Sequence, residues 1–254
     1  MNKPADLAAE VRAYCVAHQD PKNALKWARY FKEGYDAWGL LDKENPLWNE
    51  KQREWMERYR GLRLDGFAKA GEILLASGKY EEASMAIRFL KELRDHDQFD
   101  DRMAERLAGY FRAGICNWGH TDVLCGEIIG PLLADGRIKL AELADWRDSD
   151  LRFQRRAVPV SMLALLKAKP AAGPLLEFVR PLMLDPERVV HQGLGWFLRE
   201  AWKQSPKPVE AFLKEWKDQS PRLIFQYATE KMTPEQKARF KAAGPRRSTA
   251  RSTR

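Results

Sequence analysis

An aromatic residue and a carboxylate stand four residues apart at Trp118 and Asp122, in the segment Cys-Asn-Trp-Gly-His-Thr-Asp. If this segment is helical, the two residues lie on one face and point at the same place. The face of an aromatic ring attracts positive charge, and a carboxylate attracts it directly. The pair therefore predicts a site for a cationic, electron-poor ligand.

Three other segments extend this pattern. Near the N-terminus, residues 28–32 read Ala-Arg-Tyr-Phe-Lys, residues 154–157 read Gln-Arg-Arg-Ala, and residues 195–200 read Gly-Trp-Phe-Leu-Arg-Glu. Together with residues 116–122, they resemble the AlkD-type DNA alkylpurine glycosylases, which are built from HEAT-like helical repeats. The resemblance runs over roughly residues 1 to 230, and the Gly-Trp-x-Leu-Arg-Glu segment is its most specific part.

The resemblance implies a monofunctional DNA glycosylase that acts in base excision repair. Such an enzyme hydrolyses the N-glycosidic bond of cationic N3- or N7-alkylated purines in duplex DNA, for example 3-methyladenine, 7-methylguanine and bulkier adducts. It implies that Asp122 is the catalytic carboxylate. The residues to which it assigns contacts with the lesion or the DNA are Tyr30, Trp118, Arg156, Trp196 and Arg199. It further implies that the lesion is held at the duplex surface and is not flipped into a deep pocket.

The chemistry of alkylated purines fits these assignments. Alkylation at N3 or N7 makes the base cationic and weakens its bond to the sugar, so little activation of the leaving group is needed. The enzyme must then stabilise an oxocarbenium-like sugar and place a water molecule. A carboxylate at Asp122 can do both, and aromatic rings favour a cationic lesion. Two residues depart from the family pattern, Gly119 where an acid is common and Thr121 where an apolar residue is common.

Each assignment also has a purely structural alternative. Asp122 can be an acid favoured by the dipole at the start of a helix. Trp118 and Trp196 can be core residues, because the chain has 9 tryptophans and most of them must be buried. Arg156 can be one charge on a solvated helix face, and Tyr30 can lie at the edge of the core.

A metal site is a further alternative for the central segment. Cys116 and His120 are four residues apart and can chelate, with Asp122 and Cys125 nearby in sequence. A closed zinc site normally has tighter cysteine spacing, so no metal is expected. The chain also lacks a phosphate-cradling glycine loop and a lysine motif for Schiff-base chemistry. No nucleotide cofactor and no lyase step are therefore expected.

The elements that position these residues are expected to be helices. Ala and Leu together number 60 of 254 residues, whereas Val, Ile and Thr together number 21, a balance that favours helix over sheet. Apolar periodicity predicts helices over residues 4–19, 47–59, 62–76, 80–93, 99–113, 123–133, 138–146, 151–167, 174–183, 186–203 and 208–217. Start signals occur at Asp20-Pro21, Asp185-Pro186 and Thr233-Pro234, the first of them opening a helix that ends near Gly34. Pro159 is expected to bend its helix.

These helices on short loops predict an all-α fold, an α-solenoid of antiparallel helix pairs whose concave face binds DNA. We expect one HEAT-like repeat domain at residues 1–243, although no repeat of fixed period is evident. Residues 244–254 are expected to form a basic, disordered tail. Four of the last ten residues are arginine and account for half of the net charge of +8. The remaining body, at +4, permits binding to nucleic acid through a local patch without requiring it.

The expected setting is the cytoplasm, in association with the nucleoid when bound to DNA, and the expected state is a monomer. The three cysteines have no pairing pattern, and neither an apolar signal core nor a membrane-spanning run is evident. Duplex DNA containing alkylated purines is the expected partner. Two other functions stay open at this point, a non-catalytic binder of damaged or branched DNA and a helical-repeat scaffold for proteins. A glycosylase specialised for bulky adducts is a third possibility within the enzyme class.

Overall fold

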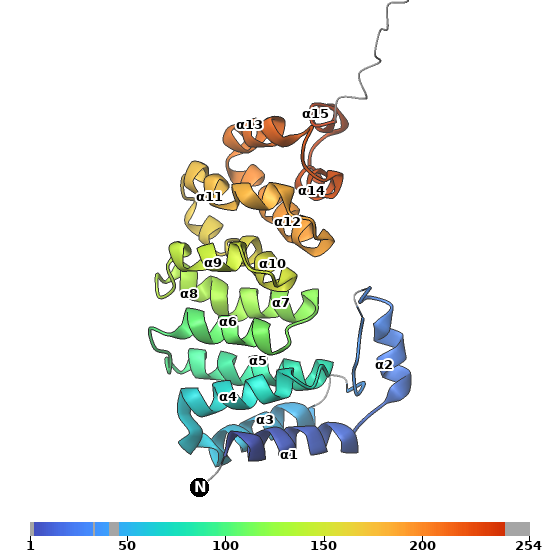
Figure 1. Ribbon diagram of the computed structural model, residues 1–254, viewed down its shortest axis with the longest axis vertical. Helices are drawn as coiled ribbons and strands as arrows, with labels where there is room; N and C mark the ends of the chain where they lie inside the picture. The colour runs from blue at the N-terminus through green and yellow to red at the C-terminus, as the bar shows by residue number, and fades with distance from the viewer. Residues whose placement is uncertain (1–2, 33, 41–45, 242–254) are drawn as a thin grey trace, which may run out of the picture. The chain divides into compact units, whose positions relative to one another are not determined.

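The computed structural model describes residues 3–32, 34–40 and 46–241, and within them the chain forms helices and no strand (Figure 1). The all-α, α-solenoid class expected from the sequence is confirmed. The chain divides into two compact units, unit 1 at Met1–Lys167 and unit 2 at Ala168–Arg254. The expected single domain at 1–243 stays a prediction, and the expected disordered tail lies outside the described residues.

Unit 1 is a stack of helices. Its α-helices are α1 (Pro4–Ala17), α2 (Pro21–Ala28), α3 (Pro46–Arg58), α4 (Arg63–Leu75), α5 (Tyr80–Asp95), α6 (Met103–Ala113), α7 (Trp118–Leu124), α8 (Gly130–Ala134), α9 (Ala144–Arg147) and α10 (Arg152–Ser161). Figure 1 shows the helices from α4 to α10 lying one above another, and α2 standing beside this stack. A π-helical segment, Cys125–Ile129, joins α7 to α8, with the N–H of Gly130 donating to the carbonyl of Cys125.

The core of unit 1 forms where α4 and α5 pack together. Phe67 on α4 and Phe89 on α5 are fully buried, with ring centroids 5.4 Å apart. Gly71 allows Tyr110 of α6 to approach closely, since a Cβ there would lie 2.5 Å from the tyrosine Cζ. Burial of such aromatic side chains supplies most of the driving force for packing the stack.

Unit 2 contains the remaining helices. They are α11 (Ala172–Val179), α12 (Arg188–Gln204), α13 (Pro206–Trp216), α14 (Arg222–Ala228) and α15 (Pro234–Ala238). The backbones of α12 and α14 approach closely at Gly195, where a Cβ would lie 2.5 Å from Cβ of Tyr227 and 2.8 Å from the carbonyl oxygen of Ile224. The glycine of the Gly-Trp-x-Leu-Arg-Glu segment is therefore required by packing.

Several helix boundaries differ from the sequence-based expectations. The helix predicted from residue 186 begins at Arg188, because the side chain of Asp185 accepts the N–H of Glu187 at 2.8 Å and closes a turn before the helix. The helix predicted over 151–167 ends at Ser161, two residues after Pro159. The starts at Pro21 and Pro234 are confirmed. None of the helices in the described part of the chain combines the length and apolarity needed to cross a bilayer.

Candidate functional site

Trp118 and Asp122 belong to one helix, which is the condition on which their pairing depends. The helix expected over residues 123–133 left both residues out, and α7 begins five residues earlier, at Trp118. The side chain of Asn117 caps the helix by accepting the N–H of His120 at 2.8 Å. Asp122 is the fifth helical residue and lies beyond the first turn. Its position is therefore not explained by a helix-start role, because the dipole favours acids within the first turn.

The carboxylate of Asp122 forms a two-point ion pair with Arg156 across the contact between α7 and α10. The arginine Nε donates to Oδ1 at 2.9 Å, and Nη2 donates to Oδ2 at 2.8 Å. The Arg156 side chain is 6% exposed and that of Asp122 is 19% exposed. Two parallel hydrogen bonds fix the plane of the carboxylate as well as its distance. Arg156 is therefore not a charge on a solvated face.

Burial raises the pKa of the Asp122 carboxyl, and the hydrogen bonds and positive charge of Arg156 lower it in part. The carboxylate thus lies in an environment of low polarity, beside a positively charged partner that favours its ionised form. A carboxylate of this kind is fixed in orientation and poorly hydrated, which strengthens its interaction with a developing positive charge.

The indole of Trp118 is held by the end of the α2 segment. Its ring stacks on Phe31, with centroids 5.3 Å apart and an interplanar angle of 18°, and its Nε1 donates to the carbonyl oxygen of Tyr30 at 3.3 Å. Phe31 is buried and stacks in turn on Tyr35 at 4.7 Å. Trp118 is nonetheless 37% exposed, so it is a supported surface aromatic and not a core residue.

Tyr30 is half-exposed. Its ring lies 5.5 Å from that of Trp27, and the guanidinium of Arg29 lies 4.9 Å above its centroid and donates to its hydroxyl at 3.0 Å. The structure brings Tyr30 and Trp118 together through the backbone of Tyr30. Sequence reasoning missed Phe31, although its position next to Tyr30 in an aromatic, basic segment was a usable signal.

The two departures from the family pattern have local structural explanations. At Gly119, an added Cβ would lie 3.2 Å from Oδ1 of Asn117 and 3.3 Å from Cε1 of Phe31. Because Phe31 fills this space, a larger residue would displace the ring that supports Trp118. The hydroxyl of Thr121 donates to the carbonyl of Asn117 at 2.8 Å, so this buried polar residue is satisfied within its own helix.

Two buried glutamates fix the segment that follows α2. The carboxylate of Glu81 accepts the backbone N–H groups of Trp38, Gly39 and Leu40 at 2.8, 2.7 and 3.0 Å. Glu82 is fully buried and accepts hydrogen bonds from Arg12, the shortest at 2.8 Å, and from Nε1 of Trp38 at 3.2 Å. Sequence reasoning missed both, because acids in the first turn of a helix usually need no partner beyond the dipole.

His120 lies beneath the aromatic residues and is buried. Asn117 donates to its Nδ1 at 2.8 Å, its Nε2 lies 3.1 Å from Oγ of Ser84, and its ring stacks on Tyr80 at 4.2 Å. Burial lowers the pKa of His120 to about 4, so the ring is neutral at physiological pH. His120 and Ser84 line a cavity of about 550 Å³ with Val123, which follows Asp122 in the chain. Arg88, Lys91 and Glu127 also line the cavity, so its charged side chains are of both signs.

A sequence model of the family described as DNA alkylation repair enzyme matches residues 11–232. The chain belongs to the DNA alkylation repair enzyme family. A solved structure titled as a predicted DNA alkylation repair enzyme from Enterococcus faecalis shares its fold, with a TM-score of 0.66 and 16% sequence identity over 85% of this chain and 97% of that one. No curated protein matches the chain. Membership of this family supports a role in the repair of alkylated DNA.

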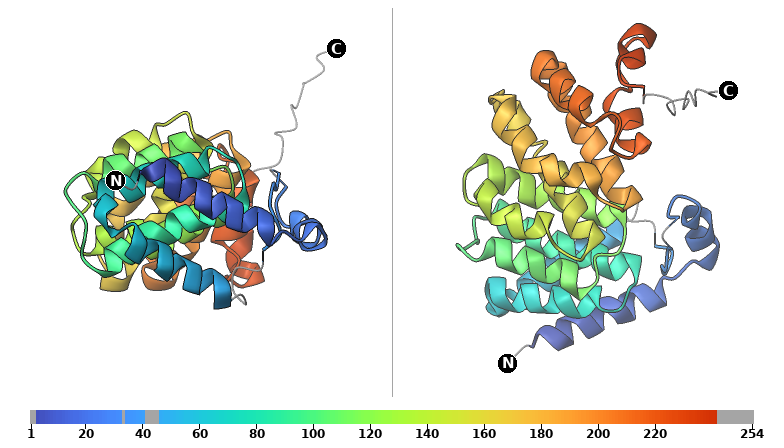
Figure 2. Two further views of the ribbon diagram at one scale, coloured as in Figure 1. Left: turned by 90° about the horizontal axis from the view of Figure 1, so that it is seen from below. Right: turned by 45° about the horizontal axis from the view of Figure 1, so that its top comes forward.

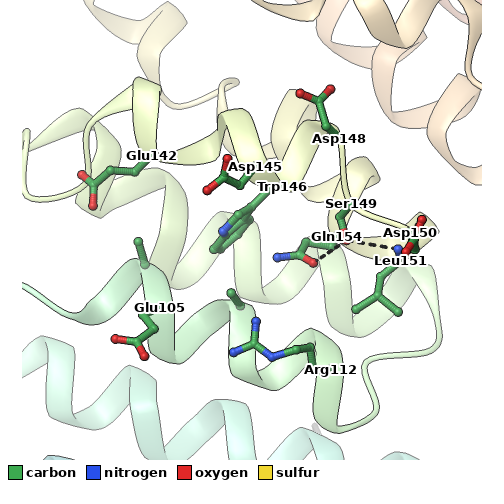
Figure 3. A pocket seen from close by; sticks show the side chains of 12 residues that line it. Glu105, Arg112, Glu142, Asp145, Trp146, Asp148, Ser149, Asp150, Leu151 and Gln154 are labelled. Atoms are coloured by element: carbon green, nitrogen blue, oxygen red, sulfur yellow. Dashed lines mark hydrogen bonds between the residues drawn. The ribbon is translucent and has the colours of Figure 1, made fainter.

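Unit 1 also has a cavity with several acidic side chains in its lining. This cavity of about 800 Å³ lies beside Trp146, between α6, α9 and the start of α10, and Figure 3 shows the side chains that line it. The carboxylates that line it are Glu105, Glu142, Asp145, Asp148 and Asp150. This density of negative charge repels phosphates. Gln154 of α10 lines this cavity, whereas Arg156 on the same helix pairs with Asp122.

In this family member, the two other predicted site residues lie on α12 of unit 2. Trp196 is partly exposed, and Arg199 pairs with Glu200 at 3.0 Å and with Glu230. Their predicted contacts with DNA stay predictions. In the described part of the chain, no group of three or more His, Cys, Asp or Glu side chains is arranged to hold a metal ion.

Proposed function

We propose that this protein is a monofunctional DNA glycosylase that releases cationic N3- and N7-alkylated purines from duplex DNA. The observation that carries the proposal is that α7 presents both Trp118 and Asp122, and that Arg156 of α10 holds the Asp122 carboxylate in a two-point ion pair. Family membership gives the context of alkylation repair. The preferred lesion, from a methyl group to a bulky adduct, belongs to the same proposal.

The proposed reaction is hydrolysis at C1′ of the lesion nucleotide. The bond from C1′ to the purine nitrogen breaks, and its electron pair neutralises the cationic base, which leaves without needing a proton. A water oxygen bonds to C1′, and one water proton passes to Asp122 or to solvent. The products are a free neutral base and an abasic site. The negative charge of Asp122 stabilises the sugar cation and orients the water.

Arg156 has two consequences for this chemistry. It fixes the orientation of the Asp122 carboxylate, and it also neutralises part of the charge that must stabilise the sugar cation. A DNA phosphate near the lesion is a competing partner for the guanidinium. In the proposed complex, Arg156 also binds a DNA phosphate, so it neutralises less of the Asp122 charge and more of that charge stabilises the sugar cation. A phosphate contact of Arg156 agrees with the contact to the DNA backbone implied by the family resemblance.

The aromatic residues provide selectivity for positive charge. The exposed part of Trp118 offers a ring to the lesion nucleotide, and Phe31 stacks against this ring and supports it. Tyr30, which precedes Phe31 in the chain, is a second exposed aromatic residue. A cation over a desolvated ring gains about 2 kcal/mol, or roughly 30-fold in affinity. Neutral purines gain little from this contact.

Release of 7-methylguanine and 3-methyladenine from methylated duplex DNA tests the proposal. Wild-type protein should release both bases, and the Asp122→Asn variant should release neither. Absence of release by the wild type, from both methylated DNA and DNA with bulky N7 adducts, would contradict a glycosylase. Salt-sensitive DNA binding without release would instead identify a non-catalytic binder of damaged DNA.

A further inference from the structure

The acidic cavity beside Trp146 lies wholly within unit 1, in the layer of α9 and α10 at the opposite end of the helix stack from α1 (Figures 1 and 2). Its volume of about 800 Å³ is in the range of ligand-binding cavities. Among the described residues in its lining, five are acidic and one, Arg112, is basic. A ligand for this cavity is therefore positively charged.

Two of these carboxylates have no partner that explains them. The side chains of Asp145 and Asp150 form neither a hydrogen bond nor an ion pair with any residue that the structure describes. The other three each contact a group close by in the sequence: Glu105 pairs with Arg102, Glu142 accepts the N–H of Lys139, and Asp148 pairs with Arg147. Asp145 and Asp150 are thus available to a cation that enters the cavity.

Gln154 supplies a second observation, which is independent of charge. The residue is 5% exposed, and its side-chain oxygen accepts the hydroxyl of Ser149 at 2.8 Å, while the same hydroxyl oxygen accepts the N–H of Leu151 at 3.1 Å. This contact orients the amide, so its nitrogen points into the cavity towards Trp146 (Figure 3). The nitrogen donates to no described residue. A buried donor without an acceptor is unfavourable, so the cavity lacks an acceptor at this point.

Trp146 forms a rigid apolar wall beside this donor. It is 4% exposed, and its ring meets that of Phe111 on α6 edge to face, with centroids 5.5 Å apart. Its indole N–H also has no acceptor among the residues that the structure describes. The wall therefore offers an apolar surface and a second donor to the same ligand.

This combination of groups distinguishes between cationic ligands. A polyamine supplies charge but no acceptor for Gln154, and none of the described His, Cys, Asp and Glu side chains gather in a group of three or more suited to a metal ion. A peptide with lysine and arginine side chains supplies cations for Asp145 and Asp150 and backbone carbonyls for Gln154. The alkyl parts of its side chains can pack on Trp146.

We propose that the cavity beside Trp146 is a docking site for a basic peptide segment of a partner protein. A carbonyl of the peptide accepts the amide of Gln154, and its cationic side chains pair with Asp145 and Asp150. Gln154 and Arg156 are two residues apart on α10, which places them about 200° apart around the helix. A docked peptide therefore leaves the pair of Asp122 and Arg156 uncovered. The inference does not depend on the proposed glycosylase function.

The test is a titration of a fluorescein-labelled peptide, Gly-Lys-Arg-Gly-Lys-Arg-Gly with blocked ends, with the full chain, followed by anisotropy. Because the chain carries a net charge of +8, a basic peptide should bind only at a local acidic site. Asp145→Asn/Asp150→Asn should weaken binding roughly 10-fold at low salt and reduce its dependence on salt. The matched control, Glu50→Gln/Asp135→Asn, removes the same charge from exposed positions outside the cavity and should bind like the wild type.

A second variant separates the amide contact from the charges. Gln154→Leu keeps the size of the side chain but removes the donor, so it should weaken binding several-fold without changing the salt dependence. Thermal unfolding of each variant shows that it is folded. A peptide with glutamate in place of lysine and arginine should not bind.

Three outcomes would overturn the proposal. The first is no binding of the basic peptide to the wild type, and the second is unchanged affinity in Asp145→Asn/Asp150→Asn. The third is full affinity in Gln154→Leu together with displacement of the peptide by spermidine, which would show a general cation site. All of these measurements are made without DNA, so they leave the proposed function standing, and failure of base release leaves the docking site standing.

Discussion

Arg156 and Asp122 face each other across the contact of α10 with α7, joined by two hydrogen bonds of 2.9 and 2.8 Å. Removing a partner from a largely buried ion pair is costly, because the remaining charge is left in a poorly hydrated environment. Substitutions on the two sides of this pair therefore have different expected effects on activity and on stability.

Asp122→Asn should abolish base release while leaving the chain folded and able to bind DNA, although loss of the carboxylate partner of the buried Arg156 lowers the free energy of unfolding. Asparagine keeps the shape of the side chain and an oxygen that accepts a hydrogen bond from Arg156, but it lacks the charge that stabilises the sugar cation. Loss of such an electrostatic contribution lowers the rate by about 10²–10³-fold or more. Single-turnover release of 7-methylguanine measures the effect. Asp145→Asn, an acid of the cavity in Figure 3, is the matched control and should keep wild-type activity.

Arg156→Gln should destabilise the protein and shift the pH dependence of base release. The unfolding free energy should fall by up to about 3 kcal/mol, at the low end for a broken buried pair because Asp122 keeps some exposure. Since Arg156 lowers the pKa of Asp122 against the effect of burial, its removal should raise that pKa further. Only the carboxylate is active, so the acid limb of the rate profile should move to higher pH. An unmoved acid limb would show that Asp122 is not the titrating group.

Gly119→Ala and Gly126→Ala should have different effects on stability. Nothing lies within 4 Å of a Cβ at Gly126, so alanine there should stabilise the protein by roughly 0.5–1 kcal/mol through its higher helix propensity. At Gly119 the new methyl group meets Phe31 and Asn117, which should cancel this gain and displace the support of Trp118. Urea unfolding and base release should therefore both distinguish the two variants. Equal stabilisation with full activity in both would contradict the packing described for Gly119.

Stability should decrease in mild acid because of His120. Its pKa is lowered from 6.5 to about 4 in the folded state, so the folded protein binds this proton less readily than the unfolded chain. The stabilisation is present above pH 6.5 and is lost as the pH falls towards 4, with a total of about 3 kcal/mol. His120→Gln should be less stable at pH 7 but should lose less stability between pH 7 and 4. Urea unfolding at these two pH values, in parallel with the wild type, measures the difference.

Local sequence signals predicted much of the fold. Asp20-Pro21 and Thr233-Pro234 start helices as expected, because a capping side chain and a proline at the first position act within a single turn. Helix α14 was not predicted, since its seven residues are too few to show a periodic pattern. The boundary near Asp185 is set by a side chain that closes a turn, and such a boundary cannot be predicted from the periodicity of apolar residues.

The site was predicted less completely, for a physical reason. The spacing of Trp118 and Asp122 places them on one face only if the segment is helical, and the predicted helix began after both of them, whereas α7 contains both. The partner of Asp122 lies 34 residues away, and only the packing of α10 on α7 brings Arg156 to it. Phe31 and Glu81 likewise act through contacts with distant segments. Residue type and spacing identify the groups that do chemistry, whereas the groups that hold them depend on tertiary packing.

The π-helical turn at Cys125–Ile129 sets the register of the helix that carries Asp122. A π turn accommodates one residue more than an α-helical turn, and each residue of an α-helix advances the face by about 100°. Shortening this turn by one residue would restore an unbroken α-helix and rotate α7 against α8. Either Asp122 would then turn away from Arg156, or the buried Ile128 and Leu132 would leave the core. Relatives that keep the pair of Asp122 and Arg156 should therefore tolerate substitutions in residues 125–129 far better than a change in their number.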